Sequence, residues 1–221
     1  MRSLTTEVHV LGRLRVGVLA SGRGSNLKAL ADAVGRGDLE VDLAVVISDV
    51  GGAGALGVAR DAGIEALYID PEKKGARMSE AAEERIITEL ASRDVGLVAL
   101  AGFMRILSPR FVAAFKMRIL NIHPSLLPSF PGLRVQKKAL EYGVKFSGCT
   151  VHFVDEGVDT GPIIIQAAVP VLDGDTEESL SARILGEEHR IYAEAIRRFA
   201  QGRLRIDGRR VTLVPEDAHK E

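Results

Sequence analysis

Short apolar runs alternate with stretches of helical spacing through the first half of the chain, and this alternation constrains the fold most. In 26–34 the apolar residues fall three and four positions apart, which is the spacing of one helix face. Regular strand–helix alternation favours a parallel sheet with helices on both faces. The predicted strands are 15–20, 41–47, 66–69 and 95–101, and the predicted helices are 26–34, 54–62 and 79–92.

The second half of the chain changes pattern at a proline-rich segment, 123–132. Its three prolines exclude a regular helix or a central strand. Two β-rich runs joined by a Gly/Asp-rich turn then favour an antiparallel pair. We therefore expect an α/β fold, with a doubly wound, mostly parallel sheet and an antiparallel C-terminal addition. The remaining predicted elements are helices 109–115, 135–142 and 176–199, and strands 118–122, 147–154, 162–171 and 211–214.

Length, charge and cysteine content narrow the class of protein. The 221 residues suit one domain, expected at 15–204 between an N-terminal extension, 1–14, and a C-terminal tail, 205–221. The net charge of −1 argues against binding nucleic acid through charge. No signal peptide is recognised and no apolar run approaches the ~20 residues that span a bilayer, so no membrane partner is expected. Cys149 is the only cysteine, which excludes an internal disulfide and favours the reducing cytoplasm.

The segment 21–26, Ser-Gly-Arg-Gly-Ser-Asn, stands between a predicted strand and a predicted helix. The amides of Gly24, Ser25 and Asn26 would open that helix, and helix N-termini attract anions, so phosphate is the expected ligand. Neither common nucleotide motif fits, because position 27 is Leu rather than Gly and no Gly-Lys-Ser/Thr follows. The alternative is a tight strand–helix turn with an N-cap and no ligand.

Asn121 and His123 stand two residues apart where a predicted strand enters the proline-rich segment. Both side chains can then face one side of the sheet, at the edge where open α/β sheets bind ligands. A carboxamide N–H and an imidazole together can stabilise a developing oxyanion, and histidine can act as acid or base near neutral pH. The alternative is a strand-end Asn and a His satisfied by the backbone.

Asp159 lies in a Gly-rich turn, 155–162, where an Asp most often caps the turn. The functional interpretation is that its carboxylate reaches His123 and stabilises the protonated imidazole. His152, in the middle of a predicted strand, is expected to be structural or to support a ligand-binding residue. No set of His, Cys, Asp or Glu has the spacing of a metal site, so no metal is expected.

Four segments, taken together and in this order, resemble the folate-dependent formyltransferases. They are 21–27 (Ser-Gly-Arg-Gly-Ser-Asn-Leu), 100–107 (Leu-Ala-Gly-Phe-Met-Arg-Ile-Leu), 120–132 with Leu-Asn-Ile-His-Pro-Ser-Leu-Leu-Pro and Phe-Pro-Gly, and 151–162 with Val-His-Phe-Val and Val-Asp-Thr-Gly-Pro. The resemblance covers about 15–204 and implies a Rossmann-like formyltransferase fold. The Gly-Ser-Asn loop and Pro131-Gly132 narrow it to members that formylate phosphoribosylglycinamide in purine biosynthesis.

The resemblance also implies a role for each matching residue. The catalytic residues would be Asn121, His123 and Asp159. The substrate phosphate would be held by Gly24, Ser25 and Asn26, and the substrate would also contact Glu188. The co-substrate would be 10-formyltetrahydrofolate, with no metal. Its pocket would be formed by Arg77, Met104, Arg105, Ile106, Leu107, Asn121, Asp155, Glu156, Gly157, Val158 and Asp159.

Two positions depart from the family pattern. The segment 73–79, which contains Arg77, aligns only with a shift, and Arg134 stands where relatives often have His. The implied partners are small molecules. A homodimer is compatible with the sequence, since 104–115 suits a core or an interface equally.

Three alternatives stay open. A folate hydrolase would share the Asn-x-His and Asp segments but carry an added N-terminal domain, whereas only 1–14 precede the first predicted strand. A methionyl-tRNA formyltransferase would need an extra C-terminal domain and a basic surface. A phosphate-ligand sensor on the same fold would keep the 24–26 loop but has no need of Asn121, His123 and Asp159 together.

Overall fold

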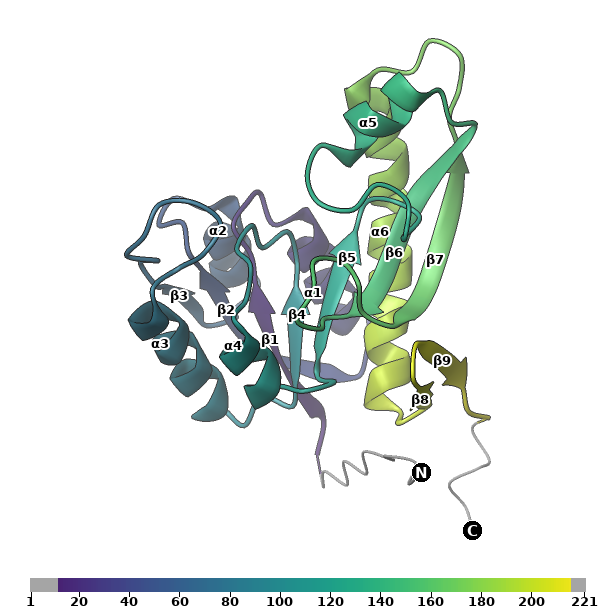
Figure 1. Cartoon of the computed structure of the whole chain (residues 1–221). Coiled ribbons are helices and arrows are strands. Elements are labelled where there is room, and N and C mark those ends of the chain that lie inside the picture. The colour runs from purple at the N-terminus through teal and green to yellow at the C-terminus, as the bar shows by residue number, and fades with distance from the viewer. Residues whose placement is uncertain (1–11, 216–221) are drawn as a thin grey trace.

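The computed structural model describes residues 12–215, and within them a nine-stranded sheet has the order β3-β2-β1-β4-β5-β6-β7-β9-β8 (Figure 1). The strands are β1 (Leu14–Leu19), β2 (Val41–Ser48), β3 (Ala66–Tyr68), β4 (Leu97–Leu100), β5 (Ile119–His123), β6 (Phe146–Phe153), β7 (Ile163–Pro170), β8 (Leu204–Asp207) and β9 (Arg210–Leu213). The helices are α1 (Ser25–Gly35), α2 (Gly54–Asp61), α3 (Glu80–Ala91), α4 (Pro109–Ala114), α5 (Val135–Tyr142) and α6 (Glu177–Ala200).

The first five strands run parallel. The order in which they are added to the sheet reverses after β3, because β2 and β3 lie on one side of β1 whereas β4 and β5 lie on the other. β1 pairs with β2 and β4, β2 with β3, and β4 with β5, all in parallel register. β6 pairs antiparallel with β5 and with β7. The expected α/β class, mostly parallel with an antiparallel C-terminal addition, is therefore confirmed. Open sheets of this kind bind ligands beyond the carboxyl ends of the strands, at the point where the strand order reverses.

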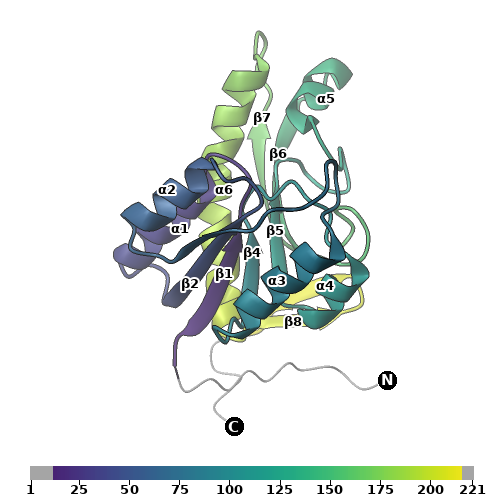
Figure 2. The ribbon, with the colours of Figure 1, turned by 90° about the vertical axis from the view of Figure 1, so that its left-hand side faces the viewer.

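Two apolar cores cover the two faces of the sheet (Figure 2). One lies under α1, α2 and α6, and the other under α3 and α4. The longest helix, α6, begins at a capping box, because the backbone N–H groups of Thr176 and Ser179 each donate to the other's side-chain oxygen. The buried hydroxyl of Tyr192 lies 2.9 and 3.1 Å from the carbonyl oxygens of Leu100 and Leu120. Tyr192 thus fixes α6 against the ends of β4 and β5.

The C-terminal part of the sheet differs from the prediction, because two strands rather than one follow α6. β8 and β9 form an antiparallel hairpin around Gly208, whose φ is +58°, and β9 meets β7 at the pair Ile163–Arg210. The residues of both strands are half-buried or exposed, so β8 has no continuous apolar run from which to predict it. Part of the expected C-terminal tail thus extends the sheet, while 1–11 and 216–221 lie outside the described residues.

No helix within 12–215 combines the length and the apolar character needed to cross a membrane. Beyond the carboxyl edge of the parallel strands, α5 and the adjoining ends of β6, β7 and α6 form a smaller lobe (Figure 1).

Candidate active site

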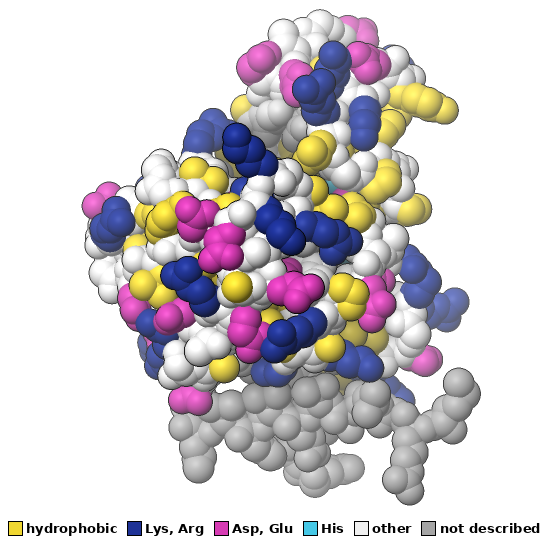
Figure 3. All heavy atoms as spheres, turned by 60° about the vertical axis from the view of Figure 1, so that its left-hand side comes forward, with side chains coloured by type: hydrophobic (Ala, Val, Ile, Leu, Met, Phe, Trp, Pro, Cys, Tyr) yellow, Lys and Arg dark blue, Asp and Glu magenta, His cyan; other side chains and the backbone are white. Residues whose placement is uncertain are grey.

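The loops that follow β1, β2, β4 and β5 meet at one edge of the sheet, where the predicted segments 24–26 and 104–107 and the end of β5 lie. On the face in Figure 3, the smaller lobe stands above a larger body, and hydrophobic side chains gather at the waist between them. Lys and Arg side chains lie just below this waist. The arrangement suits ligands that combine an apolar ring system with negative charge.

The loop before α1 is shaped by glycine. Gly24 occupies the cap position of α1 with φ +84°, and no side chain caps the helix. A Cβ built on Gly24 would lie 2.7 Å from Cα of Ala55, and one built on Gly54 would lie 2.9 Å from the carbonyl oxygen of Arg23. The loop therefore packs against the start of α2 too closely for any side chain at Gly24, and the first amides of α1 are left for a ligand.

Asn26 connects this loop to the long helix α6. Its Nδ2 donates to Oε2 of Glu188 at 2.8 Å, and both side chains are buried. Burial raises the pKa of the Glu188 carboxyl, and the hydrogen bond from Asn26 partly opposes that shift. The Oδ1 atom of Asn26 is buried without a hydrogen-bond partner among the described residues. The structure thus brings Asn26 and Glu188 together, as the implied substrate site requires.

Asn121, His123 and Asp159 lie in one cluster, which also includes His152. Asn121 and His152 stand opposite each other across the β5–β6 pair, with Nδ2 3.2 Å from Nε2. The two carboxylate oxygens of Asp159 lie 3.5 Å from Nδ1 of His123 and 3.7 Å from Nε2 of His152. The two histidine side chains are 6% and 2% exposed and that of Asp159 is 12% exposed, so charge interactions here are little screened by water.

The hydrogen bonds of His152 define its protonation. Its Nδ1 lies 2.8 Å from the carbonyl oxygen of Phe153, which can only accept, so the proton is on Nδ1. Burial lowers the pKa of His152, which favours the neutral ring. Its Nε2 therefore accepts an N–H from Asn121, which leaves the second N–H of that amide for another acceptor.

The proline-rich segment closes over His123. Nε2 of His123 lies 3.0 Å from the carbonyl oxygen of Phe130, and Asp159 accepts the backbone N–H of Gly132 at 2.8 Å. Phe130 and Asp159 have φ values of +53° and +55°, which side-chain-bearing residues rarely adopt. Residues with strained backbone conformations of this kind are concentrated at active sites and ligand-binding sites.

The segment 104–107, expected at the folate pocket, lies at this same edge after β4. Met104 is 60% exposed, but the side chain of Arg105 is not free: its Nε lies 2.6 Å from Oδ2 of Asp49. Arg77 is exposed, and the carbonyl oxygen of its neighbour Ala76 accepts the N–H of Ile106 at 2.7 Å. That bond places Arg77 alongside the segment 104–107.

The turn 155–159 carries the other residues expected at the folate pocket. Oδ1 of Asp155 accepts from the N–H of Gly157 and from the hydroxyl of Thr160, so this carboxylate closes the turn itself. Glu156, Gly157 and Val158 are exposed beside it. Their contacts with folate stay predictions.

Asp49 is the buried residue that the sequence analysis missed. It follows β2 directly, is 4% exposed, and accepts hydrogen bonds from Ser21 and Arg105. Its place at the carboxyl end of a parallel strand was the available signal. Within the described part of the chain, no three His, Cys, Asp or Glu side chains are grouped so as to hold a metal ion.

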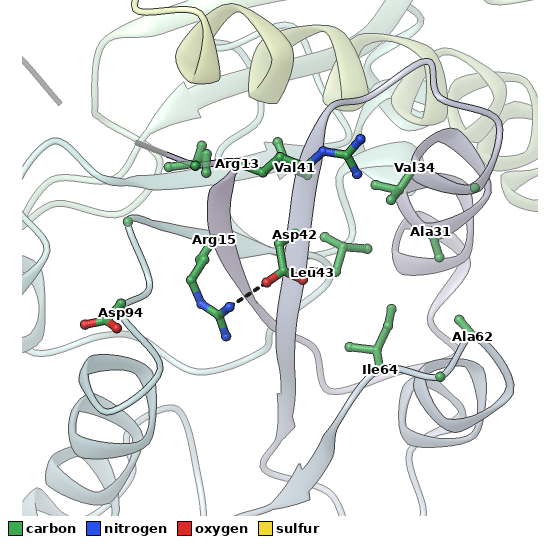
Figure 4. A pocket seen from close by; sticks show the side chains of 15 residues that line it. Arg13, Arg15, Ala31, Val34, Val41, Asp42, Leu43, Ala62, Ile64 and Asp94 are labelled. Carbon is green, nitrogen blue, oxygen red and sulfur yellow. Dashed lines mark hydrogen bonds and ion pairs between the residues drawn. The ribbon is translucent and has the colours of Figure 1, made fainter. Parts of the chain in front are cut away.

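A cavity of about 930 Å³ lies at the opposite edge of the sheet, near the amino ends of β1 and β2 (Figure 4). Arg15 and Asp42 form an ion pair at 2.7 Å there, and apolar side chains such as Ile64 complete the lining. None of the predicted site residues lines this cavity, so the chemistry is assigned to the carboxyl edge.

Comparison with known proteins identifies relatives over most of the chain. Residues 14–196 match the family described as Formyl transferase. The phosphoribosylglycinamide formyltransferase of Escherichia coli is 44% identical over 87% of this chain and 90% of its own length. The trifunctional purine biosynthetic protein adenosine-3 of Drosophila pseudoobscura pseudoobscura is 48% identical over 95% of this chain, which spans only 15% of that protein. The crystal structure of glycinamide ribonucleotide transformylase 1 from Symbiobacterium toebii is similar with a TM-score of 0.88 and 53% identity, covering 96% of this chain and 100% of that chain.

Proposed function

The chain belongs to the formyl transferase family, and from this premise we propose that it transfers the formyl group of 10-formyltetrahydrofolate to the amine of 5′-phosphoribosylglycinamide in de novo purine biosynthesis. The observation that carries the proposal is the buried cluster of Asn121, His123 and Asp159 at the carboxyl edge of the sheet. The uncapped start of α1, suited to a phosphate, lies at that same edge.

The reaction begins when the neutral amine attacks the formyl carbon. A carbon–nitrogen bond forms, and the electron pair of the formyl carbonyl moves onto its oxygen. The second N–H of Asn121 donates to this oxygen, because the first is held by His152. A donor of this kind contributes about 2.7–4 kcal/mol to lowering the barrier.

His123 is the second group that stabilises the formyl oxygen. In this structure, Nε2 of His123 lies 3.0 Å from the carbonyl oxygen of Phe130, which acts as its acceptor. When the substrates bind, the formyl oxygen replaces that carbonyl oxygen as the acceptor. The Asp159 carboxylate faces Nδ1 at 3.5 Å and so helps to orient the ring with Nε2 towards the formyl oxygen. The intermediate then expels the folate nitrogen, which takes up a proton as the attacking amine loses one, with Asp159 assisting this transfer through water.

The other groups bind and orient the two substrates. Gly24, Ser25 and Asn26 hold the phosphate through first-turn amides, and Glu188 accepts hydrogen bonds from the substrate. The folate is held by Asn121 and Asp159 and by Arg77, Met104, Arg105, Ile106, Leu107, Asp155, Glu156, Gly157 and Val158. Placing both substrates next to each other removes much of the entropic barrier.

The test is a formyl-transfer assay with purified protein and 10-formyltetrahydrofolate, with and without phosphoribosylglycinamide, alongside His123→Ala. Turnover that requires the amine and collapses in the variant supports the proposal. Equal loss of formyl from the folate without the amine would identify a hydrolase. Tight binding of the phosphoribosyl compound without turnover would identify a sensor.

A further inference from the structure

Asp49 forms a buried bridge between two loops. Its side chain is 2% exposed, and its two carboxylate oxygens have different partners. The hydroxyl of Ser21 donates to Oδ1 at 2.6 Å, and Nε of Arg105 donates to Oδ2 at 2.6 Å. Ser21 follows β1 and opens the phosphate-binding loop, whereas Arg105 follows β4 and belongs to the segment expected at the folate.

The bridge crosses the point where the strand order reverses. Oγ of Ser21 also accepts the backbone N–H of Met104 at 2.8 Å, and the N–H of Ser21 donates to the carbonyl oxygen of Gly102 at 3.1 Å. The loops after β1 and β4 are therefore joined in three ways. Two are these direct hydrogen bonds, and the third is Asp49, which binds the hydroxyl of Ser21 and the guanidinium of Arg105.

Arg105 extends the same network to a third loop. Its Nη1 donates to the carbonyl oxygens of Gly75 and Lys73, in the segment that carries Arg77. A shift of Asp49 would thus be transmitted to both the phosphate side and the folate side of the site. Because buried charge-assisted hydrogen bonds are strong and directional, the bridge favours one joint arrangement of these loops.

We propose that Asp49 is a positioning residue that couples the two substrate subsites, so that ordering the phosphate-binding loop tightens folate binding, and the reverse. The inference rests on the proposed function, since it takes the two subsites from it. Linkage requires the coupling to be reciprocal, and couplings of this kind change affinity about fivefold or more. Asp49 contacts neither substrate in this role and acts through Ser21 and Arg105.

The experiment is calorimetric titration of the full chain with phosphoribosylglycinamide and with tetrahydrofolate, each alone and with the other saturating. The ratio of the two dissociation constants for one ligand is the coupling factor. We expect at least about fivefold in the wild type, falling towards one in Asp49→Asn and in Ser21→Ala. Asp49→Asn removes the negative charge that pairs with Arg105, and its amide nitrogen cannot accept a hydrogen bond as the carboxylate oxygen did. Ser21→Ala removes only a hydroxyl and supplies the test if the first variant fails to fold.

Ser48→Ala is the matched control. Ser48 is the neighbouring residue and is fully buried, and among the described residues its hydroxyl bonds only to the backbone of Val50. The Ser48→Ala variant should have the same coupling factor as the wild type, even if its melting temperature falls. A wild type with no coupling, or folded Asp49→Asn and Ser21→Ala variants that retain it, would overturn the inference. A wild type that neither binds these ligands nor turns over contradicts the proposed function itself, which the activity assay reports separately.

Discussion

The amide nitrogen of Asn121 lies 3.2 Å from Nε2 of His152, directly across the β5–β6 pair. Since Nδ1 of His152 is bonded to the carbonyl oxygen of Phe153, Nε2 is the only ring atom left to accept. The contact therefore orients the Asn121 amide with its nitrogen towards His152. His152 thus sets the direction of the donor that we assign to the formyl oxygen.

The first prediction concerns His152→Leu, which removes the acceptor for Asn121. With one hydrogen bond of about 1 kcal/mol lost, the amide can rotate, and kcat should fall about fivefold. KM for both substrates should stay within a few-fold, because His152 touches neither. His152→Gln offers an acceptor oxygen and should recover part of kcat. Steady-state kinetics on both variants provides the check, and a Leu variant with wild-type kcat would refute the orienting role.

The second prediction concerns Asp159→Asn. Asp159 faces Nδ1 of His123 and accepts the N–H of Gly132, so the neutral amide keeps a side chain of similar shape but loses the charge. Hydrogen bonds to charged groups are worth about 1.5–3 kcal/mol, so kcat should fall about 10- to 100-fold. Tetrahydrofolate binding, measured by titration, should be largely kept. Near-wild-type turnover would remove Asp159 from the mechanism.

The parallel half of the sheet could be predicted closely from the sequence, because its central strands, β1 and β4, are largely buried on both faces. β4 is a continuous apolar run, and β1 is buried and uncharged from Val16 to Leu19. The predicted bounds 15–20 and 95–101 accordingly differ from Leu14–Leu19 and Leu97–Leu100 by two residues at most. The exposed strands β8 and β9 lack this signal, and one of the two was missed.

The candidate site was predictable only in part. Asn121 and His123 could be located because they end a strand, but the partner of Asn121 depends on the register of β6, which no local pattern fixes. The pairing of Asp49 with Arg105 likewise depends on the strand order, which brings the loops after β2 and β4 together around β1. The sequence therefore indicated Arg105 at the folate pocket, but the buried ion pair between Arg105 and Asp49 could not be predicted from it.

The third prediction compares Gly24→Ala with Gly22→Ala. At Gly24 a Cβ would lie 2.7 Å from backbone Cα of Ala55 and the residue would have to keep φ +84°. The left-handed conformation alone costs about 1–2 kcal/mol, so the melting temperature should fall by several degrees and KM for the ribonucleotide should rise. At Gly22 a Cβ meets nothing within 4 Å, so that variant should resemble the wild type in both measurements. Equal effects at the two glycines would contradict the packing argument.

The fourth prediction concerns the pH dependence of stability through Glu188. Burial raises the pKa of this carboxyl in the folded state above its usual value of 4.5, so between those two values the folded protein binds more protons than the unfolded chain. Its contribution to the free energy of unfolding is therefore fully present below about pH 4.5 and is lost as the pH rises through the folded pKa. Glu188→Gln stays neutral throughout and can still accept from Asn26. Its stability relative to the wild type should rise as the pH increases from about 4.5 to neutral.

The same variant should bind the ribonucleotide less well, because a neutral amide is a weaker acceptor than a carboxylate. We expect KM for that substrate to rise about tenfold at neutral pH, while the urea midpoint of the variant relative to the wild type rises as the pH increases towards neutral. Glu187→Gln is the matched control, since Glu187 is the preceding residue of α6 and pairs with Arg190 near the surface. It should leave both the relative pH profile and KM unchanged. A Glu188→Gln protein whose stability difference from the wild type is flat with pH would show that burial does not disfavour this carboxylate.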